Sequence, residues 1–146
     1  MTLPYATATS GRSATDDIRK ILQAFGCTKF APMEDFAAGA VTIQFEYRGR
    51  LVQVTASAKG YAAALMKRRK RTDRPALWSE KEAIAQGHIA VWSIIRDWIK
   101  GQITAIETGV LSFEGAFLGQ ILLPTGETVL DRISSQGLLP PPDASK

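Results

Sequence analysis

One short run of basic residues is the part of this sequence with the clearest chemistry. Six of the eight positions from 67 to 74 are basic, and Asp73 is the only acid among them: Lys67, Arg68, Arg69, Lys70, Arg71 and Arg74. We call residues 67–74 the basic segment. Removing its six basic residues and one acid from the totals of 18 and 14 leaves 12 and 13, so the segment carries +5 and the rest of the chain −1. Charge concentrated in this way predicts an anionic partner.

Two interpretations of the basic segment compete. Cations stabilise the C-terminal end of a helix because they complement its dipole, which explains two or three of the six charges. The remaining charges favour an anion-binding surface, since positions 67, 70, 71 and 74 repeat with helical spacing. We therefore predict binding to the nucleic-acid backbone or to another phosphorylated ligand, with Arg69 and the nearby Lys59 widening the surface.

Aromatic rings beside positive charge are able to stack on nucleic-acid bases. Trp78 lies in the loop just after the basic segment and is our first candidate for such a ring. Tyr47 and Arg50 flank a predicted hairpin turn and are the second. Trp92 and Trp98 fall instead on the apolar stripe of a long predicted helix, which favours a core or dimer contact for both.

Enzymatic chemistry finds little support in these residue types. His88, the only histidine, lies on an apolar stripe, and Cys27, the only cysteine, follows a helix exit where no cluster of amides lowers its pKa. A Cys27–His88 nucleophile pair is therefore disfavoured. Two such ligands are too few for zinc, and Glu107 and Glu114 belong to no paired motif. No Gly-rich phosphate loop is evident. We expect a protein that is not an enzyme, with no catalytic residue, no metal and no cofactor.

Length and composition indicate one globular domain. The 146 residues are enough to bury a core without disulfides, and the single cysteine excludes an internal disulfide and is compatible with a reducing compartment. The N-terminus does not resemble a signal peptide, and no apolar run reaches the roughly 18 residues that span a bilayer. We expect a cytoplasmic protein without a membrane partner. Its organisation would be a flexible N-terminus over 1–12, a domain over 13–137 and a Pro-rich tail over 138–146.

The first half of the chain predicts a helix, a hairpin and a second helix. Ser13 and Gly26 bracket a helix over 14–25 with a buried stripe. Alternating apolar residues predict strands on both sides of a turn at Arg48-Gly49, with Phe45 opposite Val52, Ile43 opposite Val54 and Val41 opposite Ala56. Residues 30–33 would add an edge strand, because Pro32 lacks an amide donor. A helix capped by Ser57 is expected over 58–70.

The second half is dominated by one long apolar pattern. A Ser79-x-x-Glu82 capping box opens a helix that, if unbroken to Thr108, spans roughly 43 Å. That length predicts either a kink near Gly101 or a half that packs on a second subunit, so we expect a homodimer through this helix. Ser112 caps a short helix beyond it. Residues 121–130 fit either a small hairpin or a helix that starts near Thr128.

Several strings resemble small uncharacterised accessory proteins of tailed phages and prophages in proteobacteria: Lys59-Gly60-Tyr61-Ala62-Ala63, Asp97-Trp98-Ile99-Lys100-Gly101-Gln102, Ala105-Ile106-Glu107-Thr108-Gly109 and Leu123-Pro124-Thr125-Gly126-Glu127-Thr128-Val129. The resemblance covers roughly 14–135 and carries no functional residue across. It implies a phage accessory protein that acts in the bacterial cytoplasm on nucleic acid or against host defence.

The expected fold is α+β, with an antiparallel hairpin sheet packed on the N-terminal helix and on the long helix. The expected function is non-enzymatic binding of nucleic acid through the basic segment. Two alternatives remain open: an inhibitor or adaptor that docks on a host protein, and a sponge that holds a nucleotide signal at an oligomer interface.

Overall fold

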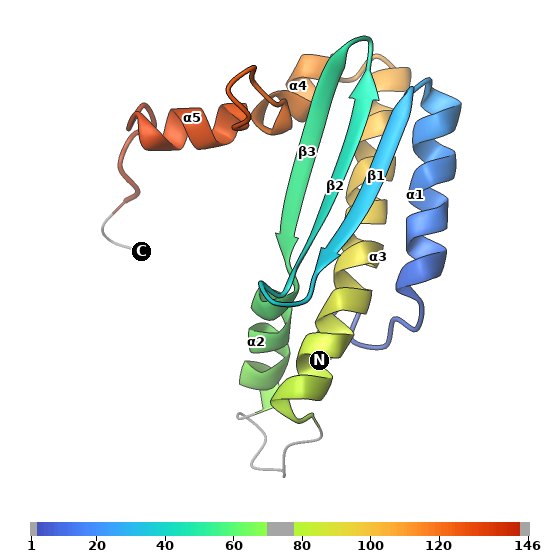
Figure 1. Ribbon diagram of the computed structural model, residues 1–146, viewed down its shortest axis with the longest axis vertical. Coiled ribbons are helices and arrows are strands. Elements are labelled where there is room, and N and C mark those ends of the chain that lie inside the picture. Colours follow the sequence, from blue (N-terminus) through green and yellow to red (C-terminus); the bar gives the residue numbers. More distant parts are fainter. Residues whose placement is uncertain (1–2, 70–77, 144–146) are drawn as a thin grey trace.

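The computed structural model describes residues 3–69 and 78–143, in which a three-stranded sheet lies against two helices (Figure 1). The elements follow in the order α1 (Gly11–Phe25), β1 (Lys29–Asp35), β2 (Ala40–Tyr47), β3 (Arg50–Ser57), α2 (Ala58–Arg69), α3 (Glu80–Glu107), α4 (Phe113–Phe117), the short 3₁₀ helix η2 (Leu118–Gln120) and α5 (Val129–Ser135). The predicted α+β class is confirmed, with the sheet packed on the N-terminal helix and the long helix.

The sheet is antiparallel in the order β1-β2-β3, and its hairpin has the register that the apolar pattern predicts. Phe45 pairs with Val52, Ile43 with Val54 and Val41 with Ala56. Both turn residues have positive φ, 50° at Arg48 and 80° at Gly49, as expected for a tight hairpin turn that follows the strand twist. The strand that we predicted over 30–33 forms β1 at the edge of the sheet.

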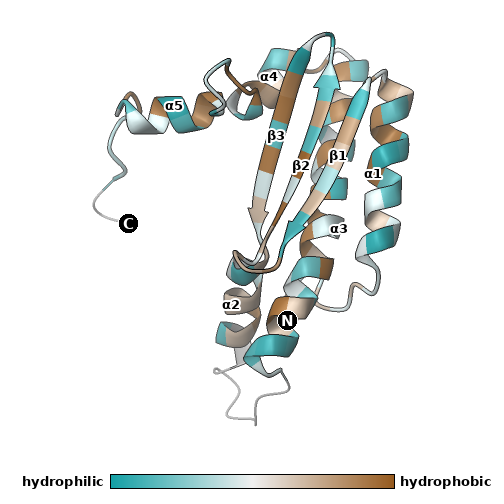
Figure 2. Ribbon diagram, viewed as in Figure 1, coloured by the Kyte–Doolittle hydropathy of each residue, from teal (hydrophilic) through white to brown (hydrophobic). Residues whose placement is uncertain are grey.

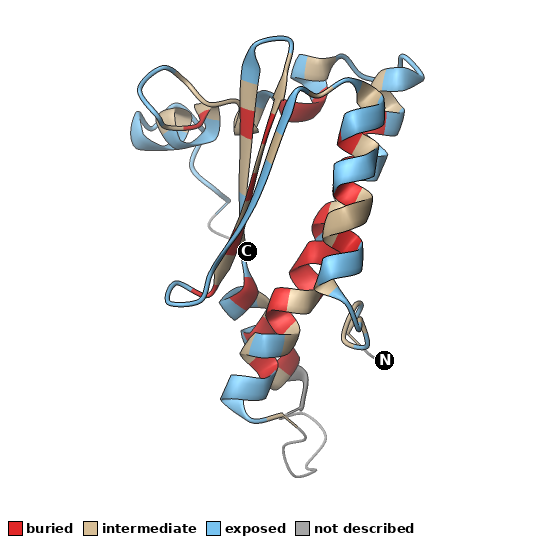
Figure 3. Ribbon diagram, turned by 45° about the vertical axis from the view of Figure 1, so that its right-hand side comes forward, coloured by how far each residue is buried: buried red, intermediate tan, exposed pale blue. Residues whose placement is uncertain are grey.

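The main core lies between the helix-facing side of the sheet and helices α1 and α3. Val41, Ile43, Phe45 and Val52 are fully buried there. Figure 2 shows apolar residues recurring along β2, β3 and α3, and Figure 3 shows buried residues along much of α3. Phe117 of α4 closes one end of this core, because its ring meets Phe45 and Trp98 edge-on at centroid distances of 5.4 and 5.6 Å.

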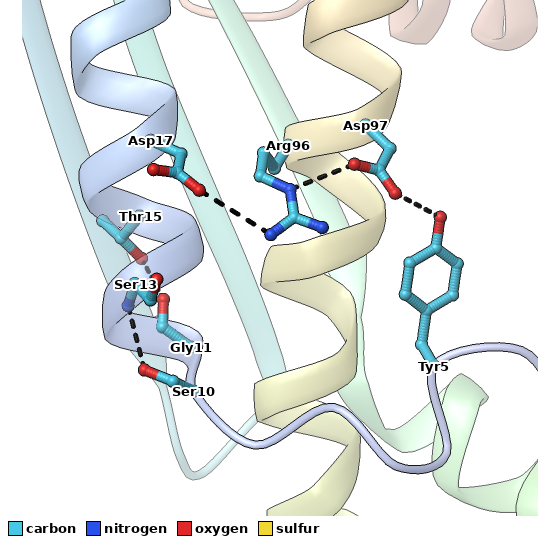
Figure 4. A network of polar contacts seen from close by, with 8 residues as sticks. All are labelled: Tyr5, Ser10, Gly11, Ser13, Thr15, Asp17, Arg96 and Asp97. Atoms are coloured by element: carbon cyan, nitrogen blue, oxygen red, sulfur yellow. Dashed lines mark hydrogen bonds and ion pairs between the residues drawn. The ribbon is translucent and has the colours of Figure 1, made fainter.

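Helix α1 begins earlier than the sequence predicts. Ser10, not Ser13, is the N-cap, and its Oγ accepts the backbone N–H of Ser13 at 3.0 Å (Figure 4). Gly26 ends the helix with φ of 109°, as predicted. Both serines are adequate caps by type, so the choice between them depends on contacts that the local sequence does not show.

The N-terminal segment is bonded to α3, which differs from the loose end that we expected over residues 1–12. Tyr5 Oη donates to Asp97 Oδ2 at 2.6 Å, and the other oxygen of Asp97 accepts from Arg96 Nε at 3.0 Å (Figure 4). Arg96 lies 3.8 Å from Asp17 of α1. These contacts join the segment, α1 and α3 on one side of the molecule.

Helix α3 is continuous through Gly101 and spans about 42 Å at 1.5 Å per residue. Of the two alternatives that the length allowed, the break near Gly101 is therefore not the one that the structure has. Its C-terminal half lies under the sheet beside α1, and its N-terminal half extends past the sheet and packs on α2 (Figure 1). The apolar stripe from which we predicted a dimer is thus buried within the chain, and the homodimer through this helix stays a prediction without that support.

The C-terminal part of the chain, from α4 to α5, extends away from the β3 side of the sheet (Figure 1). Ser112 caps α4, as predicted, by accepting the N–H of Gly115 at 2.9 Å. Of the two alternatives for residues 121–130, the structure contains the helix: Thr128 and Asp131 form a capping box that opens α5. In place of the hairpin, residues 121–130 form isolated bridges, such as that between Leu122 and Thr128. Within the described residues, none of the helices is long and apolar enough to cross a membrane.

Candidate nucleic-acid interface

Helix α2 and the first turns of α3 form an arm that extends beyond the end of the sheet (Figure 1). Ser57 opens α2 as predicted, because its Oγ accepts the N–H of Gly60 at 2.8 Å. Ser79 opens α3 in the same way and accepts the N–H of Glu82 at 3.1 Å. The basic segment begins in the last turns of α2, so the arm determines where the segment starts.

Small residues let the two helices of the arm approach closely. A Cβ built on Gly87 of α3 would lie 2.4 Å from the carbonyl oxygen of Ala58 in α2. Farther along the arm, Ala62, Leu65 and Ala83 form a second buried cluster. The arm therefore has an apolar interior of its own.

The structure describes only part of the basic segment. Lys67 lies in α2 with an exposed side chain. Arg68 and Arg69 are the last two residues of that helix. Lys70, Arg71 and Arg74 lie outside the described residues. Lys59, predicted to widen the surface, lies at the other end of α2, where its Nζ donates to the carbonyl of Ala37 at 3.3 Å.

Acidic residues that our sequence reasoning did not weigh lie at the same end of the arm. Glu80 and Glu82 occupy the first turn of α3, where they complement the positive end of the helix dipole. Lys81 lies between them and is exposed. The sequence already places these carboxylates six and eight residues after Arg74, the last residue of the basic segment.

The aromatic rings that were predicted to stack on bases pack against other residues of this chain. Trp78 is partly buried and packs against the cluster of Ala62, Leu65 and Ala83. The Tyr47 ring contacts Phe25 at a centroid distance of 4.4 Å and Phe113 at 5.0 Å. These contacts occupy much of the ring surface that stacked bases would need.

The charged side chains near the hairpin turn also make contacts within the chain. The Arg48 guanidinium lies 5.2 Å from the centroid of the Tyr47 ring. Arg50 forms an ion pair with Glu114 of α4. A hydrogen bond from the backbone N–H of Glu114 and, next, its bond to Arg50 lower the pKa of this carboxylate. The second predicted stacking site, Tyr47 with Arg50, is therefore largely occupied by contacts within this chain.

The residues considered for enzymatic chemistry lie apart from one another. Burial raises the pKa of the Cys27 thiol to about 11, which makes it a poor nucleophile at neutral pH. His88 lies near the start of α1, because Phe36 and Glu34 contact it and its neighbour Ile89 packs at Gly11. Cys27 lies just beyond the other end of α1, whose 15 residues span about 22 Å at 1.5 Å per residue, so the two residues form no pair. Trp92 is buried, as expected, and donates to Glu34 Oε1 at 3.0 Å.

Comparison of the chain with protein-family models, with curated proteins and with solved structures found no match.

Proposed function

We propose that this chain is a non-enzymatic, phage-type accessory protein that binds nucleic acid through residues 67–74. The observation that carries the proposal is the separation of charge, with +5 in the segment and −1 in the remainder of the sequence. If the net charge of +4 were spread over the surface, a contribution to solubility would be enough to explain it. A single concentrated site is instead typical of a surface that contacts phosphates.

The arm supports the proposal by its position. α2 leads into the segment and α3 begins shortly after it, and both helix ends lie far from the β2–β3 turn (Figure 1). Because Ala62 and Leu65 fill the α3-facing side of α2, the exposed Lys67 is available to solvent. At this end of the arm, Lys67 meets an extended polyanion without obstruction from the sheet.

Phosphate contacts would supply most of the affinity. Each neutralised phosphate releases counterions, so the logarithm of the binding constant falls by about 0.9 per contact for each tenfold rise in salt concentration on duplex DNA. Six cations set an upper slope of roughly 5 on that relation. Such binding is largely independent of base sequence. The partial burial of Trp78 agrees with a minor contribution from base stacking.

Fluorescence anisotropy with labelled duplex and single-stranded DNA and RNA at several salt concentrations tests the proposal. The test variant replaces Arg68, Arg69 and Arg71 with glutamate. The matched control makes the same charge change at three exposed lysines outside the segment: Lys20, Lys29 and Lys100. We expect the test variant to lose binding and the salt slope, and the control to keep most of both.

Two results would overturn the proposal: binding that is equal in the two triple variants, or no binding by the native protein at about 50 mM salt. Each of the two alternative functions is tested by a measurement of its own. Host protein captured from nuclease-treated lysate, and lost in the test variant, would indicate an inhibitor or adaptor. A nucleotide released from the purified protein and detected by mass spectrometry would indicate a nucleotide sponge.

A further inference from the structure

A cleft of about 760 Å³ lies between α1, β1 and α3, and the described residues that line it include none of the basic segment. Arg12 and Thr15 of α1 form one wall, Met33 and Glu34 of β1 form the other, and His88 and Trp92 of α3 form the floor. Its volume is in the range of pockets that hold small organic molecules. No sequence motif groups these residues, because they come from three elements far apart along the chain.

His88 is the unusual residue of this cleft. Its side chain is 10% exposed, and both ring nitrogens are buried without a hydrogen-bond partner among the residues that the structure describes. Nδ1 lies 3.5 Å from Glu34 Oε1, which is within reach of an ion pair but lacks the geometry of a hydrogen bond. Buried polar atoms are nearly always paired in native proteins, so an imidazole left in this state points to a partner that enters the cleft.

The cleft is lined by two arginines and two carboxylates, and among the described residues only one of the arginines, Arg19, is paired. Arg19 pairs with Asp16 at 2.8 Å, and Glu34 accepts the indole N–H of Trp92. Arg12 makes no side-chain hydrogen bond or ion pair among the described residues. It also lies in the first turn of α1, where a cation opposes the helix dipole. Its placement therefore weakens the helix and leaves an exposed guanidinium beside the cleft.

Apolar surface completes the site. Met33 is 58% exposed and Phe36 is 74% exposed, and both line the cleft. The Phe36 ring also lies 5.3 Å from the His88 ring, so it partly covers the unpaired imidazole. An apolar ring placed against Met33 and Phe36 would cover surface that is now in water.

We propose that this cleft binds a small aromatic acid. Its ring packs on Met33 and Phe36, its anionic group pairs with Arg12, and a polar atom of the ligand bonds to His88 once the exposed Phe36 ring turns away from the imidazole. Carboxylate and phosphate share this chemistry, and Arg12 is suited to either because its guanidinium donates two parallel bonds. This site is separate from the proposed nucleic-acid surface and does not depend on it.

The other candidate sites in the molecule are weaker. A pocket beside Tyr47 is lined by Arg50 and Glu114, which pair with each other. The exposed leucines near α5, such as Leu130, form an apolar surface with nothing to indicate what covers it. Within residues 3–69 and 78–143, no three His, Cys, Asp or Glu side chains form a group able to hold a metal.

The single histidine makes the proposal directly testable by NMR. We would titrate the protein with naphthalene-2-carboxylate and, separately, with the neutral naphthalene-2-carboxamide, and follow the His88 ring and Trp92 indole signals. The carboxylate is expected to shift both signals saturably. The carboxamide is expected to bind at least about tenfold more weakly. Phenyl phosphate and benzoate then distinguish the two classes of acid.

Variants on one helix provide the control. Arg12→Gln is expected to weaken carboxylate binding at least about tenfold, whereas Lys20→Gln, an exposed cation of α1 outside the cleft, is expected to leave it unchanged. Because the Arg12 side chain has no polar partner among the described residues, Arg12→Gln should not lower the midpoint temperature of thermal unfolding. The proposal is overturned by the absence of a saturable shift at His88, by equal affinity for the carboxamide, or by equal affinity in the two variants.

Discussion

Replacing Gly87 with alanine tests how the arm is held together. Gly87 is buried where α3 meets the start of α2, and an added Cβ would lie 2.4 Å from the Ala58 oxygen and 3.1 Å from the Ala58 carbonyl carbon. Both atoms belong to backbone, so no side chain is free to turn aside. α2 would have to move away by roughly 1 Å to restore ordinary contact distances.

Two effects of opposite sign determine the magnitude. Alanine is favoured over glycine inside a helix by about 0.8–1 kcal/mol. Overpacking a close contact costs about 1–3 kcal/mol, with rigid backbone at the upper end. We therefore expect Gly87→Ala to lower the free energy of unfolding by about 2 kcal/mol. Gly101→Ala in the same helix is the matched control, because within the described residues no atom outside the nearby backbone of its own helix lies within 4 Å of its added Cβ, and it should raise that free energy by about 0.8 kcal/mol.

Urea unfolding of both variants, followed by circular dichroism and tryptophan fluorescence, measures the difference. A gap of about 3 kcal/mol between them supports a close approach of α2 and α3 at Gly87. A Gly87→Ala protein as stable as Gly101→Ala would refute it. DNA-binding assays on the same variants then show whether binding depends on the arm.

Three further predictions concern other parts of the chain. Burial raises the pKa of Cys27 to about 11 from 9.0, so alkylation by iodoacetamide at pH 8 should be about a hundredfold slower in the folded protein than in urea. The hydrogen bond from Tyr5 and then that from Arg96 lower the pKa of Asp97 from 3.8, so the stability that these bonds supply is present above pH 3.8 and lost as the pH falls through the folded-state pKa. Tyr5→Phe should therefore cost about 0.5–1 kcal/mol at pH 7, and chemical unfolding at decreasing pH should show this cost shrinking in acid. Gly49→Ala should cost about 1–2 kcal/mol in the same unfolding assay because φ is 80° there with no atom within 4 Å of the added Cβ, and Gly49→Asn, which tolerates this conformation, should cost less.

The hairpin shows which parts of the fold are readable from sequence. Side chains alternate strictly between the two faces of a strand, so shifting the register by one residue would turn Phe45 and Val52 toward water. The apolar pattern and the Arg48-Gly49 turn therefore allow one pairing, and the structure has it. The Ser57, Ser79 and Ser112 caps were predictable for a similar reason, because each requires only a few neighbouring residues.

Where a choice depends on distant residues, the sequence was not enough. The helix start at Ser10 instead of Ser13 accompanies contacts of Gly11 with Trp92, 81 residues later along the chain. The dimer predicted from the α3 stripe rested on an apolar surface that α1, α2 and the sheet cover within one chain. Periodicity identifies a face that must be buried, but it does not identify what buries it.

The sequence alone determined the basic segment, the hairpin register, most helix caps and the α+β class, because each follows from charge or from patterns over a few residues. Only the tertiary structure decided that α2 packs on α3 at Gly87 and that Trp78 is partly buried. It also decided that Arg12, Glu34 and His88 line one cleft. The physical reason is that close approach, burial and the absence of a partner are relations between elements, which the packing of the whole chain establishes.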